Sequence, residues 1–324
     1  MLSTSIDNTN DILHKKEIEL SDIKYKLTNQ QNAMGKLDFY YSQFRTWADE
    51  YGLDSEGIVA MKDGTFWISD EYGPHIVHYD ADGKQIERIS PFGIDTGKRH
   101  LPAVLARRRA NRGMEGLAIT PDEKTLVGIM QSTLFNPSKK EISNKQLVRI
   151  VTFDIKTGRT KQYAYIQNKE TDSTCGITAL SNTEFVVIER DGKFSGEKEA
   201  HKYLFKIDLK DATDITGENP ESKEGLLING KTLEQCSTEE IEAAGIKPVK
   251  KEFLVDLVEY LPNKYPHDKL EGLWILDSNT IAVANDNDFA INVENNQLVQ
   301  KKLPGTGRID NDVIYVIKLP RSLR

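Results

Sequence analysis

The most constraining feature of this chain is a short phrase that recurs with an acid in the same place. A Glu-Gly pair precedes an apolar run three times, in DSEGI (54–58), MEGLAI (114–119) and LEGLWI (270–275). A degenerate copy, CGITAL (175–180), carries Cys175 where the others carry glutamate. In chain order, the four copies are 59, 60 and 96 residues apart. A period near 60 residues with β-type units indicates a repeat architecture, in which stacked units bury a continuous core.

Each copy resolves into four short strands. The second copy reads LAIT, TLVGIM, QLVRIVTF and TKQYAYI, and Gly- and Asp-containing turns such as KDGT (62–65) and IKTGR (155–159) connect strands. Four strands per unit are typical of a propeller blade. We therefore predict an all-β fold, a β-propeller of four-stranded blades. Because the first strand of each blade lies nearest the axis, the three glutamates should converge at one mouth of the central channel.

The repeat also predicts the domain organisation. We expect one propeller domain over 1–324, with blades beginning near residues 53, 113, 174 and 268, and an insertion at 211–249. Residues 1–15 should form a disordered tail and residues 16–52 a partial blade. The strand predicted at 16–27 either closes the ring by pairing with the last blade or belongs to a longer parent with five to six blades. We prefer the longer parent, and we then expect self-association through an exposed edge, because unpaired edges template pairing.

Composition excludes several classes of protein. The net charge of −7 argues against a nucleic-acid partner, because binding to phosphate backbones depends on clustered Lys and Arg. The sequence has no apolar run near 18 residues, so we expect no transmembrane segment. Two cysteines make neither a disulfide framework nor a thiolate metal site. Residues 1–15 are polar and lack the apolar stretch of an export signal.

Glu56, Glu115 and Glu271 are the first candidates for catalysis and for metal binding. Carboxylates that converge on an axis repel one another unless a cation lies among them or some are protonated. Calcium takes 6–8 oxygen ligands and suits such a site better than zinc. The alternative is a structural latch, in which each glutamate accepts hydrogen bonds from the backbone of the neighbouring blade.

Further candidate metal ligands follow the second strand of the first and last copies. They are Asp70 and Glu71 in SDEYG, and Asn285, Asp286 and Asp288 in NDND. Loops at strand ends present such residues at the mouth of a propeller. The alternative is that these side chains only stabilise tight Asx turns.

Two arginines are candidates for substrate binding. Arg112 precedes Glu115 by three residues, and Arg190 lies between two acids in ERD. A guanidinium near an acidic mouth can bind phosphate or carboxylate in a bidentate manner. The alternative is that each arginine only neutralises neighbouring acids. His100 is the one histidine that we would test as an acid or base.

The chain also resembles a known family. NRGMEGLAITPDEKTLVGIMQS, DSEGI followed by FWISDEYGP, the VIERDG run and LEGLWILDSNTIAVANDNDF resemble the phytase-like, or esterase-like, propellers of bacteria. The resemblance covers about residues 53–320. It implies a β-propeller with acids at the axis, hydrolysis of phosphoesters or esters, and an extracellular or periplasmic location in most members, whereas this sequence shows no export signal.

Three functions follow as hypotheses. The first is a calcium-dependent phosphoester or ester hydrolase that acts on a small anionic or ester substrate at the axial mouth. Because G-x-S-x-G is absent, water activated by a metal and a carboxylate would be its nucleophile. The alternatives are a lactonase-type calcium propeller, and a non-catalytic propeller that binds a ligand or protein and uses calcium for stability.

Overall fold

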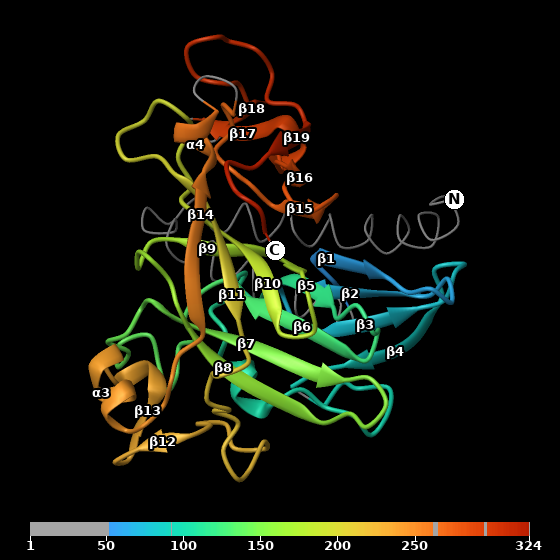
Figure 1. Ribbon diagram of the computed structural model, residues 1–324, viewed down its shortest axis with the longest axis vertical. Coiled ribbons are helices and arrows are strands. Elements are labelled where there is room, and N and C mark those ends of the chain that lie inside the picture. Colours follow the sequence, from blue (N-terminus) through green and yellow to red (C-terminus); the bar gives the residue numbers. More distant parts are fainter. Residues whose placement is uncertain (1–51, 92, 262–264, 295–296, 324) are drawn as a thin grey trace, which may run out of the picture. The chain divides into compact units, whose positions relative to one another are not determined.

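The computed structural model describes residues 52–91, 93–261, 265–294 and 297–323 (Figure 1). The tail predicted at 1–15 and the strand predicted at 16–27 lie outside these residues, as does all but the last residue of the predicted partial blade. Within the described residues, no helix is both long and apolar enough to cross a membrane.

Four antiparallel sheets follow one another along the chain. The first contains β1 (Ser55–Ala60), β2 (Phe66–Asp70), β3 (Ile76–Tyr79) and β4 (Gln85–Ile89). The second contains β5 (Met114–Ile119), β6 (Thr125–Met130), β7 (Leu147–Asp154) and β8 (Thr160–Ile166). The third contains β9 (Ser173–Ala179), β10 (Glu184–Arg190), β11 (Lys202–Asp208) and β14 (Lys250–Asp256). The fourth contains β15 (Gly272–Ile275), β16 (Thr280–Ala284) and β19 (Ile314–Lys318).

The first strands of these sheets are neighbours in turn: β1 contacts β5, β5 contacts β9, and β9 contacts β15. This succession of sheets confirms the predicted all-β propeller fold. One apolar core joins the first three sheets and includes Trp67, Leu117 and Phe185. A second core joins the third and fourth sheets through residues such as Ile188 and Ile281.

The glycine of the repeated phrase permits close approach between blades. A Cβ atom at Gly57 would lie 2.5 Å from the backbone nitrogen of Leu117 in the second sheet. At Gly116, it would lie 3.0 Å from the backbone nitrogen of Ile177 in the third. Both separations are tighter than ordinary van der Waals contact, so a side chain there would push the innermost strands apart.

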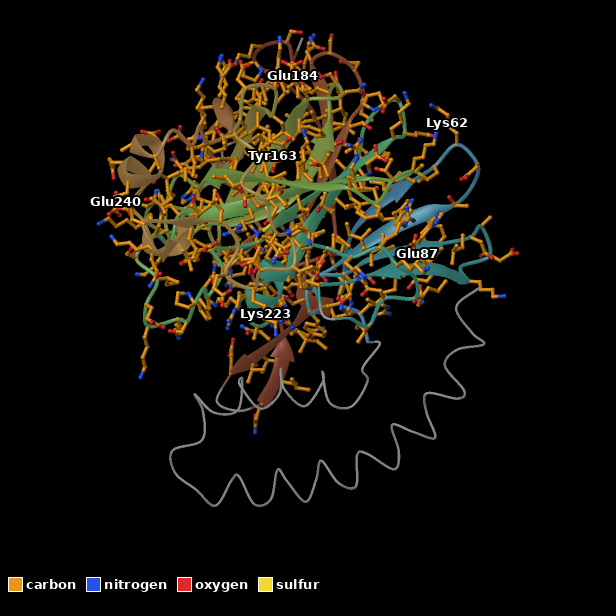
Figure 2. All side chains as sticks on the ribbon, turned by 90° about the horizontal axis from the view of Figure 1, so that it is seen from below. Lys62, Glu87, Tyr163, Glu184, Lys223 and Glu240 are labelled. Atoms are coloured by element: carbon orange, nitrogen blue, oxygen red, sulfur yellow. The ribbon has the colours of Figure 1, made fainter. Side chains whose placement is uncertain are left out.

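Other elements lie between and beside the blades. β12 (Leu227–Ile228), β13 (Lys231–Thr232), η2 (Leu233–Gln235) and α3 (Thr238–Ala243) separate β11 from β14, and α4 (Leu257–Tyr260) follows β14. The 3₁₀ helix η1 (Ala103–Arg107) follows Pro102. η3 (Asp288–Ala290) and the hairpin of β17 (Ile291–Glu294) and β18 (Gln297–Gln300) separate β16 from β19. Glu240 on α3 and Lys62 in the β1–β2 turn point outward (Figure 2).

The two faces of the fourth sheet have different surroundings. Ile281, Val283 and Ile317 are buried in the core shared with the third sheet. On the other face, Trp274 pairs through Ala282 with Val316. Trp274 is 48% exposed and Val316 is 66% exposed. One face of this blade therefore carries exposed apolar side chains.

Candidate functional site

The repeated acid lies at an irregularity in the innermost strand. Met114 pairs with Met130 and Gly116 with Ile129, so Glu115 is an extra residue in the register between β5 and β6. The register of β1 also shifts around Glu56, and that of β9 shifts at the position of Cys175. A β-bulge bends the strand and redirects the side chain of the extra residue. In the first three sheets the phrase therefore coincides with a bulge that turns the residue out of the regular alternation, whereas Glu271 directly precedes β15, which pairs with β16 in regular register.

Glu115, Cys175 and Glu271 come together from three sheets. Each offers one ligand atom, and these atoms lie within 4.8 Å of one another. Oε1 of the buried Glu115 accepts a hydrogen bond from the Gln131 amide, whereas its Oε2 has no hydrogen-bond partner in the described part of the chain. Oε2 of Glu271 also lacks one there. Two carboxylate oxygens thus face this centre without a donor.

A second acidic group belongs to the first sheet. Asp54, Glu56 and Glu71 each offer a carboxylate oxygen, and these atoms again lie within 4.8 Å of one another. Glu71 is buried, whereas Glu56 is exposed. Asp54 was not among the residues predicted from the sequence, although it begins the DSEGI phrase and lies two residues before Glu56.

The two groups share one electrostatic environment. Burial, followed by the charges of Glu56 and Asp54, raises the pKa of Glu71 to about 9. Partial desolvation by the surrounding protein, followed by the charge of Glu271, raises the pKa of Glu56 to about 8. Because the side chain is still exposed to water, solvent screens part of this effect. Burial and the charges of Glu271, Glu71 and Glu56 hold the pKa of Glu115 well above its usual range. Carboxylates from three blades therefore oppose one another's ionisation.

The two arginines lie beside these acids. Arg190 is buried and forms an ion pair with Glu271, while its Nε atom lacks a hydrogen-bond partner among the described residues. Nη1 of Arg112 donates a hydrogen bond of 2.8 Å to Oγ of Ser173, and its charge opposes the rise in the pKa of Glu71. Arg190 is thus engaged with an acid, whereas Arg112 holds a neutral hydroxyl beside the acidic centre.

Two of the predicted ligands are engaged with backbone groups. Asp70 accepts hydrogen bonds from the backbone nitrogens of Asp54 at 2.7 Å and Gly73 at 2.6 Å, and it pairs with His75. Oδ1 of Asn285 accepts a hydrogen bond of 2.8 Å from the backbone of Val313. These contacts hold loops in place, and neither side chain belongs to the two acidic groups.

Asp286 and Asp288 form ion pairs with lysines. Lys269 Nζ lies 2.7 Å from Oδ2 of Asp286 and 2.5 Å from Oδ1 of Asp288. Lys301 Nζ lies 2.8 Å from the other oxygen of Asp288. Lysine side chains therefore already pair with both carboxylates, although Lys301 also pairs with Asp268 at 2.8 Å. The charge of Asp286 nevertheless contributes to the raised pKa of Glu56.

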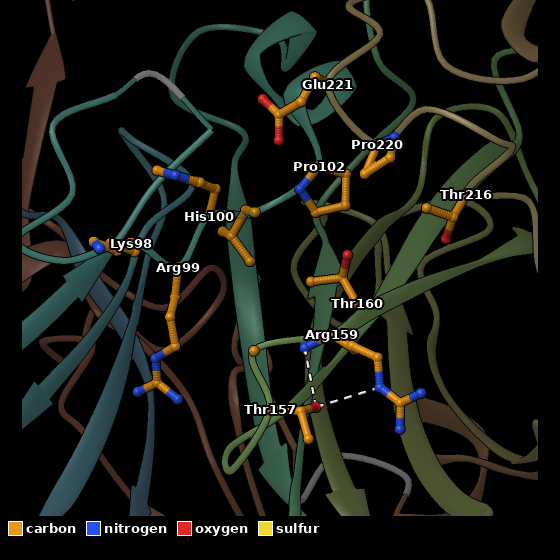
Figure 3. Close-up of a pocket in the computed structure, with 12 residues that line it drawn as sticks. Lys98, Arg99, His100, Pro102, Thr157, Arg159, Thr160, Thr216, Pro220 and Glu221 are labelled. Carbon is orange, nitrogen blue, oxygen red and sulfur yellow. Dashed lines mark hydrogen bonds between the residues drawn. The ribbon is translucent and has the colours of Figure 1, made fainter.

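His100 lies at a separate pocket of about 320 Å³, which Figure 3 shows between the segment before η1, the β7–β8 turn and the insertion. Its Nδ1 atom lies 2.7 Å from Oδ2 of Asp95. Arg99 and Arg159 also line the pocket, and none of the axial carboxylates does. His100 is therefore not part of the acidic centre.

The donor atoms of the acidic centre fit a hard cation. Oxygen ligands from several carboxylates suit calcium, and a cation would satisfy the unpartnered oxygens of Glu115 and Glu271 while relieving the mutual repulsion. Burial raises the pKa of the Cys175 thiol well above its usual range, so this residue does not supply a thiolate. Asp54, Glu56, Glu71, Glu115 and Glu271 are the residues that could hold such an ion.

The sheets and the bulge-borne acids define a β-propeller with an acidic centre at its innermost strands. The family model for phytase-like proteins, described as "Esterase-like activity of phytase", matches residues 6–289, and the chain belongs to this family. This confirms the resemblance found in the sequence.

A curated relative in the fungus Arthroderma benhamiae is described as an "Uncharacterized secreted protein". It is 27% identical over 235 residues, which are 57% of this chain and 46% of the relative. The match thus spans about half the length of that relative.

Among solved structures, the chain is similar to the Cps50 (Swd1) β-propeller domain of Myceliophteria thermophila. That match has 7% identity and a TM-score of 0.33, and it covers 83% of this chain and 57% of the other. Virginiamycin B lyase from Staphylococcus aureus is 15% identical with a TM-score of 0.26, over 82% of this chain and 91% of the other. Both superpositions are loose, so the fold assignment rests on the sheets of the chain itself.

Proposed function

We propose that this protein is a calcium-dependent hydrolase of ester or phosphoester bonds that acts at its acidic centre. Membership of the phytase-like family supports hydrolase chemistry in general. The observation that carries the specific proposal is the pair of unpartnered carboxylate oxygens, on Glu115 and Glu271, within a cluster of acids from different blades. Such a cluster is costly to maintain unless it binds a cation, protons or both.

The residues of the centre would divide the work. A bound calcium ion would polarise a substrate oxygen and make a water molecule more acidic. A carboxyl group with a pKa near 8 or 9, such as Glu56 or Glu71, can accept or donate a proton near neutral pH. Arg112 would hold an anionic substrate group, and Arg190 would orient Glu271 through its ion pair.

The Arg190–Glu271 pair is also the observation that favours a non-catalytic propeller with structural calcium. It joins the third and fourth sheets, as a latch between blades would. The latch hypothesis, however, expected backbone donors from the neighbouring blade. The donors to Glu115 and Glu271 are instead the side chains of Gln131 and Arg190.

A hydrolase assay separates these functions. A phosphomonoester, a carboxylic ester and a lactone should be compared at equal concentration, with calcium and with chelator, since activity on the lactone alone would indicate the lactonase-type alternative. Glu115→Gln should lower kcat for the calcium-dependent hydrolysis by about 100-fold or more, because it removes a ligand or base while keeping the shape of the side chain. Glu184→Gln, on the outward side of β10, is the matched control and should leave the rate unchanged.

If none of the three substrates is hydrolysed by folded, calcium-loaded protein, the hydrolase proposal is wrong and the binding propeller remains. The description of the fungal relative as secreted supports the further proposal that this protein also acts outside the cytoplasm. Extracellular calcium is abundant enough to fill a site of modest affinity.

A further inference from the structure

A tyrosine, a histidine and an aspartate that do not belong to the acidic centre are joined by hydrogen bonds. The Tyr315 hydroxyl lies 2.7 Å from Nε2 of His267, and Nδ1 of His267 lies 2.5 Å from Oδ1 of Asp310. His267 and Asp310 are 1% and 0% exposed, whereas Tyr315 is only partly buried. The line therefore runs from a buried carboxylate to a phenol that water can reach.

The surroundings determine how the protons are shared. Lys301 Nζ lies 3.5 Å from Oδ2 of Asp310 and 2.8 Å from a carboxylate oxygen of Asp268 and of Asp288. An ionised carboxylate can only accept hydrogen bonds, so Nδ1 of His267 carries the proton that it donates to Asp310. Nε2 is then free to accept the hydrogen bond from the Tyr315 hydroxyl. This is the tautomer in which an imidazole can act as a base toward that hydroxyl.

The phenol and the imidazole both line a cavity of about 550 Å³. Arg308 and Asn311 line it as well, together with apolar side chains that include Leu303 and Val313. Arg308 is exposed and offers a cation to an incoming ligand. The cavity thus combines a hydroxyl already bonded to a base, a positive charge and an apolar wall, as a site for a small organic anion requires.

We propose that Tyr315, His267 and Asp310 form a second catalytic site, in which the Tyr315 hydroxyl is the nucleophile that cleaves carboxylic esters bearing a negative charge. The arrangement is the triad of nucleophile, base and orienting carboxylate, with a phenol as the nucleophile. It supplies the protein nucleophile that the sequence does not reveal, and it requires no metal.

The reaction is balanced by these groups and water. The Tyr315 oxygen bonds to the ester carbonyl carbon while Nε2 of His267 takes the phenol proton. The bond to the leaving alkoxide then breaks, and the alkoxide takes that proton from Nε2. Water cleaves the acyl-tyrosine in the same way, which releases the carboxylic acid and restores the phenol. Asp310 stabilises the imidazolium at both stages, and Arg308 holds the anionic group of the ester.

The protonation of Tyr315 is consistent with this role. Burial, followed by the charge of Asp310, raises the pKa of the phenol. The hydroxyl is therefore protonated at neutral pH, so it depends on the imidazole to remove its proton during attack. A serine in a triad depends on its histidine in the same way.

The test uses the full chain with 4-acetoxybenzoate as the anionic ester and 4-nitrophenyl acetate as the neutral one. Tyr315→Phe removes only the hydroxyl and should lower kcat/KM for 4-acetoxybenzoate by about 100-fold. Tyr260→Phe is the matched control, because the Tyr260 hydroxyl donates to the carbonyl of Lys318 at 2.9 Å and lies outside the cavity lining. Arg308→Gln should raise KM for the anionic ester and leave the neutral ester unchanged.

Two readouts separate this site from the acidic centre. The ester activity should survive chelator and Glu115→Gln, both of which should abolish metal-dependent hydrolysis. Mass spectrometry of rapidly quenched protein should place an acetyl group on the peptide that contains Tyr315. The proposal is overturned if folded parent protein neither hydrolyses the ester nor acquires the label. It is also overturned if Tyr315→Phe, with an unchanged melting temperature, retains the parent rate, or if the label lies elsewhere.

Discussion

Raising the pH in the absence of metal should destabilise this protein, and Glu71 should be one cause. Its carboxyl group is buried beside Glu56 and Asp54, which raises its pKa from 4.5 to about 9. Between these two values, the folded protein retains a proton that the unfolded chain has released. The free energy of unfolding therefore falls as the pH rises across this window.

The magnitude follows from one retained proton. Each pH unit in the window lowers the free energy of unfolding by about 1.4 kcal/mol, so Glu71 alone accounts for a loss of about 2.7 kcal/mol between pH 6 and pH 8. The buried Glu115 adds a loss of the same sign. Saturating calcium should flatten this dependence, because an adjacent cation favours the ionised carboxylate in the folded state.

Urea denaturation at pH 6 and pH 8, with calcium or with chelator, measures both effects. Glu71→Gln mimics the protonated carboxyl group and should remove about 2.7 kcal/mol from the pH dependence of the metal-free protein. Glu184→Gln, at a partly exposed side chain that pairs with Lys206 outside the acidic centre, should not change it. Equal pH dependence in the parent protein and in Glu71→Gln would refute the assignment, and equal dependence with and without calcium would refute the metal site.

Three further substitutions test the Arg190–Glu271 ion pair, the close approach of the blades and the exposed face of the fourth sheet. Arg190→Leu should destabilise the metal-free protein by about 3 kcal/mol in urea denaturation, because Glu271 loses its cation. Calcium should restore part of this stability, whereas an unchanged stability would show that the ion pair is energetically neutral. Gly57→Ala should lower the free energy of unfolding by about 1–3 kcal/mol, because the methyl group forces adjacent blades apart. Gly192→Ala, which has open space around it, should change the free energy of unfolding by no more than about 0.5 kcal/mol. Equal effects would contradict close approach of the blades at Gly57. The exposed apolar face at Val316 should allow the protein to self-associate, and Val316→Lys should weaken this association. Sedimentation velocity measures both, and a parent protein that stays monomeric at high concentration would contradict this expectation.

The repeat predicted the fold because its physical cause is local and recurs. In the first two copies, Glu-Gly followed by an apolar run encodes a strand that carries a bulge and approaches its neighbour closely, and Glu271 occupies the equivalent position beside the innermost strand of a sheet without a bulge. The convergence of Glu115 with Glu271 follows from that equivalence. Periodicity could not reveal the role of Asp54. This residue joins the acidic group because the start of β1 pairs with the end of β2, which brings Asp54 beside Glu71.

Strand-end acids were harder to interpret, because the same residue types serve turns, ion pairs and metals. Asp70 and Glu71 are adjacent in sequence, yet Asp70 accepts backbone hydrogen bonds while Glu71 joins the acidic group. Lys269 and Lys301, which balance Asp286 and Asp288, come from separate segments of the chain. Only the tertiary structure determines which acidic side chains pair with a lysine or arginine.

The third blade makes the centre asymmetric. Where the repeat would place a further carboxylate, this blade has the protonated thiol of Cys175, and it also brings the guanidinium of Arg190 toward Glu271. The first blade contributes Asp54, Glu56 and Glu71, and within the described part of the chain none of these three carboxylates forms an ion pair with a lysine or arginine. A hard cation should therefore bind among these acids and the unpartnered oxygens of Glu115 and Glu271, and Arg112, which donates to Ser173 of the third sheet, should hold an anionic substrate group nearer the third blade. Replacing Cys175 with glutamate would restore the repeat but place a new carboxylate beside Arg190, so it should weaken anion binding more than it strengthens binding of the cation.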